Sequence, residues 1–190
     1  MTNLTKQAIK KSCIKLLNER PYHKITVKDI VEDCGINRNS FYYHYQDLPS
    51  LIEEIIIEEA DRIIQNYSRI ETIEEGLNAA VSFALKNKKA VLHIHNSASR
   101  EIYEQYVWRV CEHITKTYID TAFSDYNIPE ADKQIIIHFH KCECFGLIIS
   151  WLNNGMKTDV TQLFHRLCEI RKGMTLEMFR RCENEKSDKI

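Results

Sequence analysis

Four side chains in the run HFHKCEC could bind a soft metal ion or respond to oxidants. They are His138, His140, Cys142 and Cys144. On a helix each His stands one turn before a Cys, and imidazole and thiolate are ligands that Zn²⁺ and similar ions prefer. The two pairs point roughly 160–200° apart around a helix, so all four cannot face one ion. Cysteine is also a common buried apolar filler. We therefore predict no metal site. A metal- or thiol-responsive sensor that uses these four residues is the alternative function.

Residues 25–45, ITVKDIVEDCGINRNSFYYHY, contain a second set of side chains with a definite chemistry. Thr26 can cap a helix with Asp29 as the partner in a capping box, and apolar residues then recur at helical spacing. Gly35 stands where a turn between two helices must tolerate a positive φ. Asn37 can cap a second, short helix over residues 38–44. This pattern predicts a helix-turn-helix.

The second helix of this motif presents polar and aromatic groups to solvent. Phe41 is expected to face the core with Ile36 and Tyr45, which leaves the other side chains outside. Arg, Asn, Ser and Tyr are suited to contacting base edges and phosphates in a major groove. The sequence predicts a DNA-contacting set of Thr26, Lys28, Asn37, Arg38, Asn39, Ser40, Tyr42, Tyr43 and His44.

The whole chain reads as helical, with about nine helices. Five Gly and three Pro in 190 residues leave few breaks. We expect helices over residues 5–19, the two helices of the motif, and further helices over 49–69, from 72, 88–95, 99–124, from 129 to before 155, and 158–182. The fold class is all-α, with a three-helix DNA-binding domain over residues 1–47 and a larger helical domain over residues 48–190.

The distribution of charge along the chain directs DNA contact to the N-terminal part. Residues 1–50 hold eight Lys and Arg against five Asp and Glu, whereas residues 51–75 hold two against eight. A basic head therefore precedes an acidic segment, which directs DNA contact to the head.

The seven scattered cysteines favour reduced thiols in a cytoplasmic protein. The chain contains no run of 18 apolar residues, so the sequence predicts no membrane-spanning helix. We find no HExxH, GxSxG, CxxC or Gly-rich phosphate loop, so we predict neither an enzyme with catalytic residues nor a bound cofactor.

Residues 5–51 resemble the DNA-binding domain of the TetR family of bacterial transcriptional regulators (TetR/AcrR type). The residues that carry the resemblance are Ala8, Leu16, Leu17, 25–27, Asp29, Ile30, Cys34-Gly35-Ile36 and Phe41-Tyr42-Tyr43-His44-Tyr45. GLIISWLNNGM also resembles a C-terminal signature of a Firmicutes-like branch. Leu48 and Gln46 replace basic residues that are frequent in the family, so phosphate contacts are expected from Lys6, Lys24 or Lys28 instead.

The resemblance implies a homodimer that binds a near-palindromic double-stranded operator, usually as a repressor, and is released by a small-molecule effector. The fourth helix would be the lever between pocket and head. In such regulators the last two long helices form the dimer interface, which points to Phe145, Gly146, Ile149, Trp151, Phe164 and Leu167. The resemblance also makes residues 48–190 an effector-binding and dimerisation domain. In such regulators the effector lies among the helices after the head, which points to His93, His95, Tyr103, Tyr106, Phe139 and His140. The alternative, that the apolar stripes of these helices pack within one subunit, stays open at this point. The effector and the operator sequence are not specified.

Overall fold

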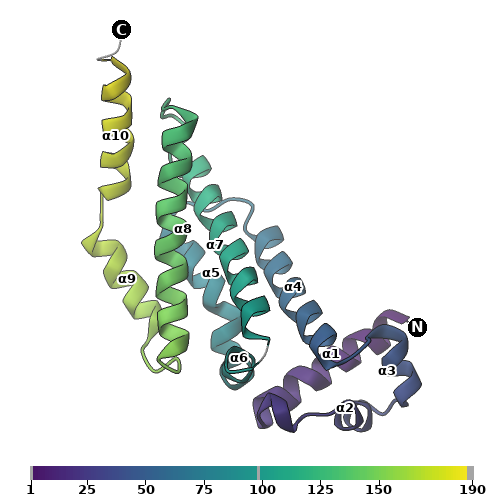
Figure 1. Cartoon of the computed structure of the whole chain (residues 1–190). Helices are drawn as coiled ribbons and strands as arrows, with labels where there is room; N and C mark the ends of the chain where they lie inside the picture. Colours follow the sequence, from purple (N-terminus) through teal and green to yellow (C-terminus); the bar gives the residue numbers. More distant parts are fainter. Residues whose placement is uncertain (1, 98, 188–190) are drawn as a thin grey trace. The chain divides into compact units, whose positions relative to one another are not determined.

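The computed structural model describes residues 2–97 and 99–187, and within them all regular structure is helical. Ten α-helices and one 3₁₀ helix follow one another along the chain (Figure 1). They are α1 (Thr2–Glu19), η1 (Tyr22–Lys24), α2 (Val27–Asp33), α3 (Arg38–His44), α4 (Leu48–Asn66), α5 (Ile73–Lys86), α6 (Lys88–His95), α7 (Arg100–Ala122), α8 (Glu130–Asn153), α9 (Val160–Ile170) and α10 (Met174–Ser187). The all-α fold class predicted from the sequence is confirmed.

The prediction of one helix over residues 158–182 was wrong. The structure ends α9 at Ile170 and begins α10 at Met174. Gly173 lies between them with φ +83°, a left-handed conformation that ends a helix and that only glycine adopts without strain. The sequence signal was therefore present, but it lay within an otherwise continuous helical pattern.

The chain divides into two compact units. Unit 1 comprises residues 1–61 and 82–106, and unit 2 comprises 62–81 and 107–190. The core of unit 1 contains residues of α1 to α4 together with Ala90 and Ile94 of α6. Helix α6 packs along α1, where the Leu17 carbonyl lies 2.7 Å from His93 Nδ1 and the Ala90 N–H donates to Asn18 Oδ1 at 3.2 Å. Helix α6 is thus grouped with the head. The functional division after residue 47 stays a prediction.

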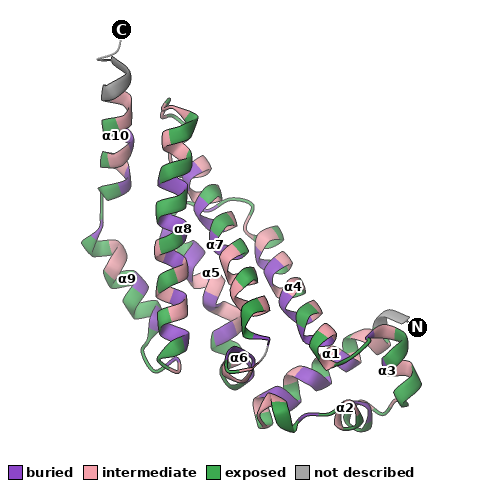
Figure 2. Ribbon diagram, in the orientation of Figure 1, coloured by how far each residue is buried: buried purple, intermediate pink, exposed green. Residues whose placement is uncertain are grey.

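Unit 2 is built on α8 and its neighbours. Figure 2 shows buried residues on one side of these helices and exposed residues on the other. Helices α5 and α7 approach closely at Gly76, because a Cβ at this position would lie 2.2 Å from Cγ2 of Ile114. A second cluster packs Phe179 of α10 against Ile119 of α7 and Ile136 and Ile137 of α8. These contacts fix the scaffold that carries the effector-binding residues expected in this part of the chain.

Helix α8 is long and apolar enough to cross a membrane by length and composition alone. Its buried face, however, carries His140 and Lys141 beside Cys144 and Ile148. Lys141 lies 3.1 Å from Glu112 and 4.4 Å above the Trp108 ring, both on α7. Polar side chains with partners inside the protein are typical of a core helix, so we interpret α8 as one.

Candidate DNA-binding interface

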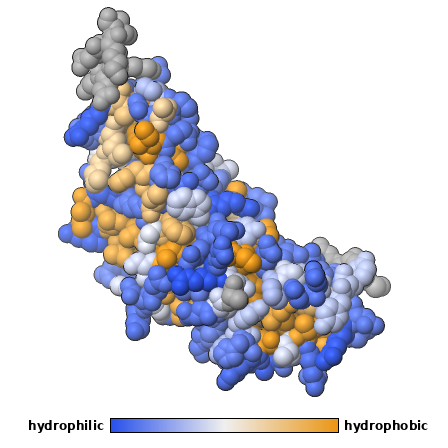
Figure 3. Space-filling view, viewed as in Figure 1, coloured by the Kyte–Doolittle hydropathy of each residue, from blue (hydrophilic) through white to orange (hydrophobic). Residues whose placement is uncertain are grey.

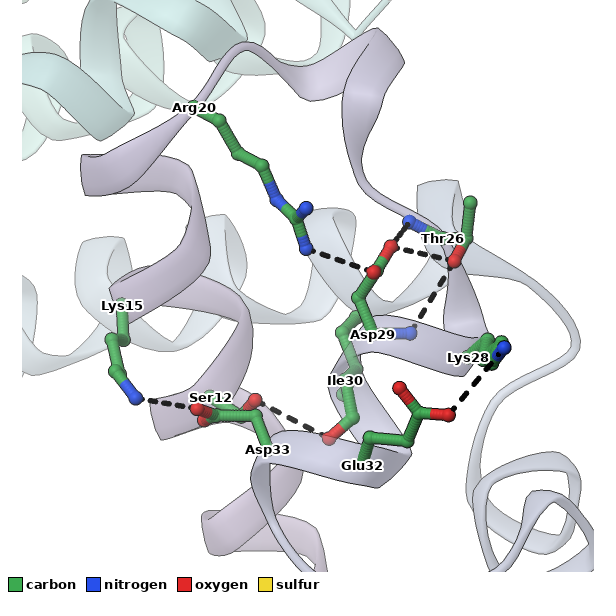
Figure 4. A network of polar contacts seen from close by, with 9 residues as sticks. All are labelled: Ser12, Lys15, Arg20, Thr26, Lys28, Asp29, Ile30, Glu32 and Asp33. Carbon is green, nitrogen blue, oxygen red and sulfur yellow. Dashed lines mark hydrogen bonds and ion pairs between the residues drawn. The ribbon is translucent and has the colours of Figure 1, made fainter.

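The first helix of the motif, α2, is fixed by the capping box expected from the sequence. The Asp29 N–H donates to Thr26 Oγ1 at 3.3 Å, and the Thr26 N–H donates to Asp29 Oδ2 at 2.8 Å (Figure 4). Arg20, directly after α1, lies 3.0 Å from the other oxygen of Asp29. The hydrogen bond from the Thr26 hydroxyl, followed by the other two contacts, lowers the pKa of Asp29 to about 2. The carboxylate therefore stays charged at the positive end of the helix, where it is most stabilising.

Further polar contacts hold α2 against α1. Lys15 pairs with Asp33, and the Ser12 hydroxyl lies 3.4 Å from the Ile30 carbonyl (Figure 4). Ile30 itself is fully buried. The two helices therefore form a rigid support for the element that follows.

The turn and the start of α3 have the expected geometry. Gly35 adopts φ +69°, and the Ile36 N–H returns to the Val31 carbonyl at 2.9 Å. The Ser40 N–H then donates to Asn37 Oδ1 at 2.8 Å, which caps α3. The turn and the cap together set the direction of α3 relative to α2.

Helix α3 anchors one face in the core and exposes the other. Phe41 is fully buried and Tyr45 nearly so, whereas Tyr42 and Tyr43 keep 54% and 75% of their surface exposed. The exposed members of the DNA-contacting set are Thr26, Lys28, Asn37, Arg38, Asn39, Tyr42 and Tyr43, and the half-buried ones are Ser40 and His44. The structure thus brings a short row of polar and aromatic groups to one surface of a fixed helix.

Several members of the set already bond to the protein. Asn37 Oδ1 also accepts from the Ser40 hydroxyl at 3.1 Å, so both groups belong to the cap. The Thr26 hydroxyl belongs to the capping box, and Lys28 lies 3.7 Å from Glu32. Lys6, considered as a source of phosphate contacts, lies 2.8 Å from Glu54. Arg38, Asn39, Tyr42 and Tyr43 are therefore the side chains best placed to meet DNA.

The effector residues expected from the sequence do not form one group within either unit. His93 bonds to the Leu17 carbonyl, His95 is 2% exposed, and Tyr103 and Tyr106 pack on the core of unit 1. Phe139 and His140 belong to unit 2, where one is exposed and the other fully buried. His93, Tyr103 and Tyr106 therefore have packing or hydrogen-bonding roles within unit 1.

Two of the residues expected at the dimer interface serve their own chain instead. Trp151 is 3% exposed and donates from Nε1 to the Thr158 carbonyl at 3.0 Å, and Phe164 is fully buried. Neither offers surface to a second copy, so their assignment as interface anchors is corrected. Gly146 is exposed, and Phe145, Ile149 and Leu167 are half-buried.

Other apolar side chains are exposed on the same helices. Figure 3 shows apolar surface over α8, α9 and α10. On α8, Ile135 keeps 64% and Phe139 keeps 45% of its surface exposed. Leu163 and Ile170 of α9 and Met174 of α10 continue the apolar surface. Sequence periodicity did not show which face of these helices is exposed, because both faces carry apolar residues.

The metal-sensor interpretation gains no support. Cys142 Sγ lies 3.5 Å from His138 Nε2 on the exposed side of α8, while His140 and Cys144 are buried on the other side. Among the described residues no three His, Cys, Asp or Glu side chains gather in a way that could hold a metal ion. The angular argument from the helix period thus agrees with the structure.

Comparison with protein families identifies the family to which the chain belongs. Residues 11–55 match the family described as bacterial regulatory proteins, tetR family. Residues 71–173, more than half of the chain, match a transcriptional regulator C-terminal region of the same group. The chain belongs to the TetR family of transcriptional regulators. TetR family members are DNA-binding transcription factors rather than enzymes, in agreement with the sequence analysis.

Similar proteins give the same fold. An uncharacterised HTH-type transcriptional regulator of Bacillus subtilis (strain 168), YxbF, is 22% identical to this chain over 85% of the chain's length. The match covers 43% of YxbF, so the chain spans less than half of that relative. The dihydroxyacetone kinase operon activator DhaS superposes with a TM-score of 0.76 at 17% identity, covering 94% of this chain and 97% of its own. GusR of Salmonella enterica superposes with a TM-score of 0.56 at 13% identity over 93% and 95% of the two chains.

Proposed function

We propose that this TetR family protein binds a near-palindromic operator as a homodimer and that a small-molecule ligand changes its operator affinity. The observation that carries the proposal is the row of Arg38, Asn39, Tyr42 and Tyr43 on α3. These side chains are exposed on a helix whose opposite face is anchored by Phe41 and whose start is capped by Asn37. A fixed helix with such groups matches the requirements of a major-groove reader.

Each side chain has a distinct role in this proposal. Arg38 offers a guanidinium to guanine edges or to phosphate, and Asn39 can bond adenine in a bidentate manner. The tyrosine hydroxyls of Tyr42 and Tyr43 reach phosphates that fix the register. Thr26 and Lys28 lie at the start of α2, where the Lys28 ammonium can meet a phosphate. Asn37, Ser40 and His44 position α3 and come close to the backbone.

Two heads on one operator require a dimer, because one small head buries too little surface for useful affinity. The exposed apolar residues Ile135, Phe139 and Gly146 of α8, with the apolar surface of α9 and α10, support self-association through these helices. The two α3 helices would then enter major grooves one turn apart, about 34–36 Å.

Ligand release would work as a shift between two conformations of the dimer. An effector lowers operator affinity only by its preference for the conformer with the wrong head spacing. The packing of α6 on α1 supports a route by which a change in α6 reaches the head. Repression by blocking a promoter is the simplest outcome, although DhaS, the neighbour with the highest TM-score quoted above, is by name an activator.

The test is operator selection followed by affinity measurement. A randomised DNA pool is enriched on the purified protein, and the selected site is titrated by fluorescence anisotropy across a salt series. We expect a two-fold symmetric consensus, one dimer per site, and a loss of about 1–3 kcal/mol of specific binding in Arg38→Ala. Arg180→Ala, an exposed arginine of α10, is the matched control and should bind as the unmodified protein does.

The result that counts against the proposal is equally definite. Enrichment of no sequence, or equal binding by Arg38→Ala and Arg180→Ala, would remove α3 as the reader. A promoter–reporter assay with the selected site then separates repression from activation.

A further inference from the structure

A cavity of about 670 Å³ opens within unit 2, and none of the residues expected from the sequence to bind an effector belongs to its lining. Its wall comes from the start of α5 and the residues before it, the end of α7 and the loop after it, and the end of α9 with the turn into α10. The lining residues are Glu71, Thr72, Ile73, Glu74, Tyr118, Ala122, Phe123, Tyr126, Cys168, Glu169, Arg171, Lys172, Gly173, Thr175 and Leu176. This volume lies in the range of small-molecule sites.

One wall of the cavity is aromatic and held in place. Phe123 stacks on Phe179 of α10 with ring centroids 4.5 Å apart, and Tyr126 meets the same ring edge-on at 5.6 Å. Tyr118 contacts Phe123 edge-on at 5.7 Å. Because Phe179 is nearly fully buried, it locks the rings before a ligand arrives. The wall therefore offers flat apolar surface at little cost in conformational entropy.

A hydrogen-bonded network lies behind the lining residues Arg171 and Thr175. Arg171 Nη1 donates to Glu143 Oε2 at 2.5 Å. His140 Nδ1 lies 2.6 Å from Arg171 Nη2 and 3.3 Å from Glu143 Oε2, and its Nε2 lies 3.2 Å from Thr175 Oγ1. The guanidinium of Arg171 is thus paired with a carboxylate of its own chain.

The outer part of the cavity carries carboxylates. Glu71 and Glu169 are exposed, and Glu74 is half-buried beside His165 at 3.1 Å. Burial raises the pKa of Cys168, and the negative charges of Glu74 and Glu169 add to this effect while Arg171 opposes it. Glu71 lies 3.5 Å from Arg69, and Lys172 is the lining cation besides Arg171. Glu74 and Glu169 are therefore the lining carboxylates placed to meet a positive ligand.

We propose that this cavity binds a small amphipathic cation, with an aromatic or apolar body on Tyr118, Phe123 and Tyr126 and an amine directed at Glu74 and Glu169. Ion pairing and attraction between the cation and the aromatic faces act together. That this ligand is the effector rests on the function proposed above. Binding to the cavity itself does not.

The experiment measures ligand binding by calorimetry on the full-length protein without DNA at pH 8. The probes are tryptamine, tryptophol and indole-3-propionate, which share an indole body and carry a cation, a neutral hydroxyl and an anion. We expect one tryptamine per protomer, bound about tenfold more tightly than tryptophol, with indole-3-propionate the weakest. Equal affinities, a preference for the anion, or binding of none of the probes would overturn the proposal.

Variants locate the site. Glu169→Gln and Glu74→Gln should each weaken tryptamine binding about two- to fivefold and leave tryptophol binding unchanged. Tyr126→Leu should weaken both ligands, because it removes the aromatic wall. Glu130→Gln, an exposed carboxylate outside the cavity lining, is the control and should change neither. Unchanged tryptamine binding in the first two variants would place the amine elsewhere.

The effector role is tested separately on the selected operator. Arg38→Ala should weaken operator binding but keep its affinity for tryptamine, whereas Glu169→Gln should keep operator binding and need about two- to fivefold more tryptamine for the same release. Failure of the cavity proposal and failure of the DNA-binding proposal therefore give different patterns. A protein that binds tryptamine but releases no operator would overturn the effector role alone.

Discussion

The close approach of α5 and α7 gives a prediction whose size can be worked out from the structure. Gly76 is buried in α5, and a Cβ built on it would lie 2.2 Å from Ile114 Cγ2. Carbon atoms in contact are normally about 3.5–4.0 Å apart. One atom must therefore move by more than about 1 Å, and Ile114 is itself only 1% exposed. Gly76→Ala will either displace α7 or force Ile114 out of its rotamer.

Two opposing terms set the magnitude. Replacing a helical glycine with alanine gains about 1 kcal/mol through helix propensity. Overpacking a filled core costs about 1–3 kcal/mol and sometimes more. With an overlap of this depth we expect the steric term to dominate, giving a net loss of about 1–2 kcal/mol. For a chain of this size that is a fall in Tm of about 2–8 °C.

A double-mutant cycle separates this clash from a general weakening. Ile114→Ala alone should cost about 2–5 kcal/mol because it leaves a cavity. In the double variant the new Cβ at position 76 enters the space that Ile114 leaves, so the loss should be smaller than the two single losses added. Denaturant unfolding followed by circular dichroism measures all four proteins. Strict additivity, or a Gly76→Ala protein more stable than the original, would refute the reasoning.

Three further predictions concern the head, the dimer and the thiols. Because folding lowers the pKa of Asp29 to about 2, from about 3.9 in an unfolded chain, its contribution to stability is present above pH 4 and is lost as the pH falls from 4 to 2. Asp29→Asn should therefore flatten the acid side of the pH–stability curve, measured by thermal unfolding at each pH. Phe139→Glu should raise the dimer dissociation constant at least tenfold in sedimentation equilibrium, and an unchanged constant would place the interface elsewhere. Cys142 should react first with a thiol reagent in a timed titration, because it is exposed, while burial raises the pKa of both Cys13 and Cys111 to about 12.

The helix-turn-helix could be derived from the sequence almost residue by residue. The capping box at Thr26, the positive φ at Gly35 and the cap at Asn37 all depend on neighbours within four positions. Local interactions of this kind leave a readable pattern, because the same residue types satisfy the same backbone groups in most proteins. The cap of α5 shows the limit of this rule. The spacing of Thr72 and Glu75 predicts a second capping box. Thr72 accepts from the N–H of Glu75, but the Glu75 carboxylate accepts from the N–H of Glu71 instead of that of Thr72.

The C-terminal helices were harder to interpret because both of their faces carry apolar residues. On α8, Ile136 and Ile148 are buried while Ile135 and Phe139 are exposed, and hydrophobicity does not distinguish the two groups. Trp151 and Phe164 were assigned to the dimer interface for the same reason, although each packs inside its own chain. Which face is covered depends on helices far away in sequence.

The sequence by itself determined the all-helical class, the helix-turn-helix and the short row of side chains that could read DNA, because these follow from caps, turns and helical periodicity. Only the tertiary structure decided the surroundings of His93 and His140 and the cavity beside Arg171. Each of these depends on contacts between helices that are distant in sequence. His140 meets Arg171 and Thr175 across 31 and 35 residues. Such contacts combine geometry and charge from separate segments, and no local pattern in the chain records them.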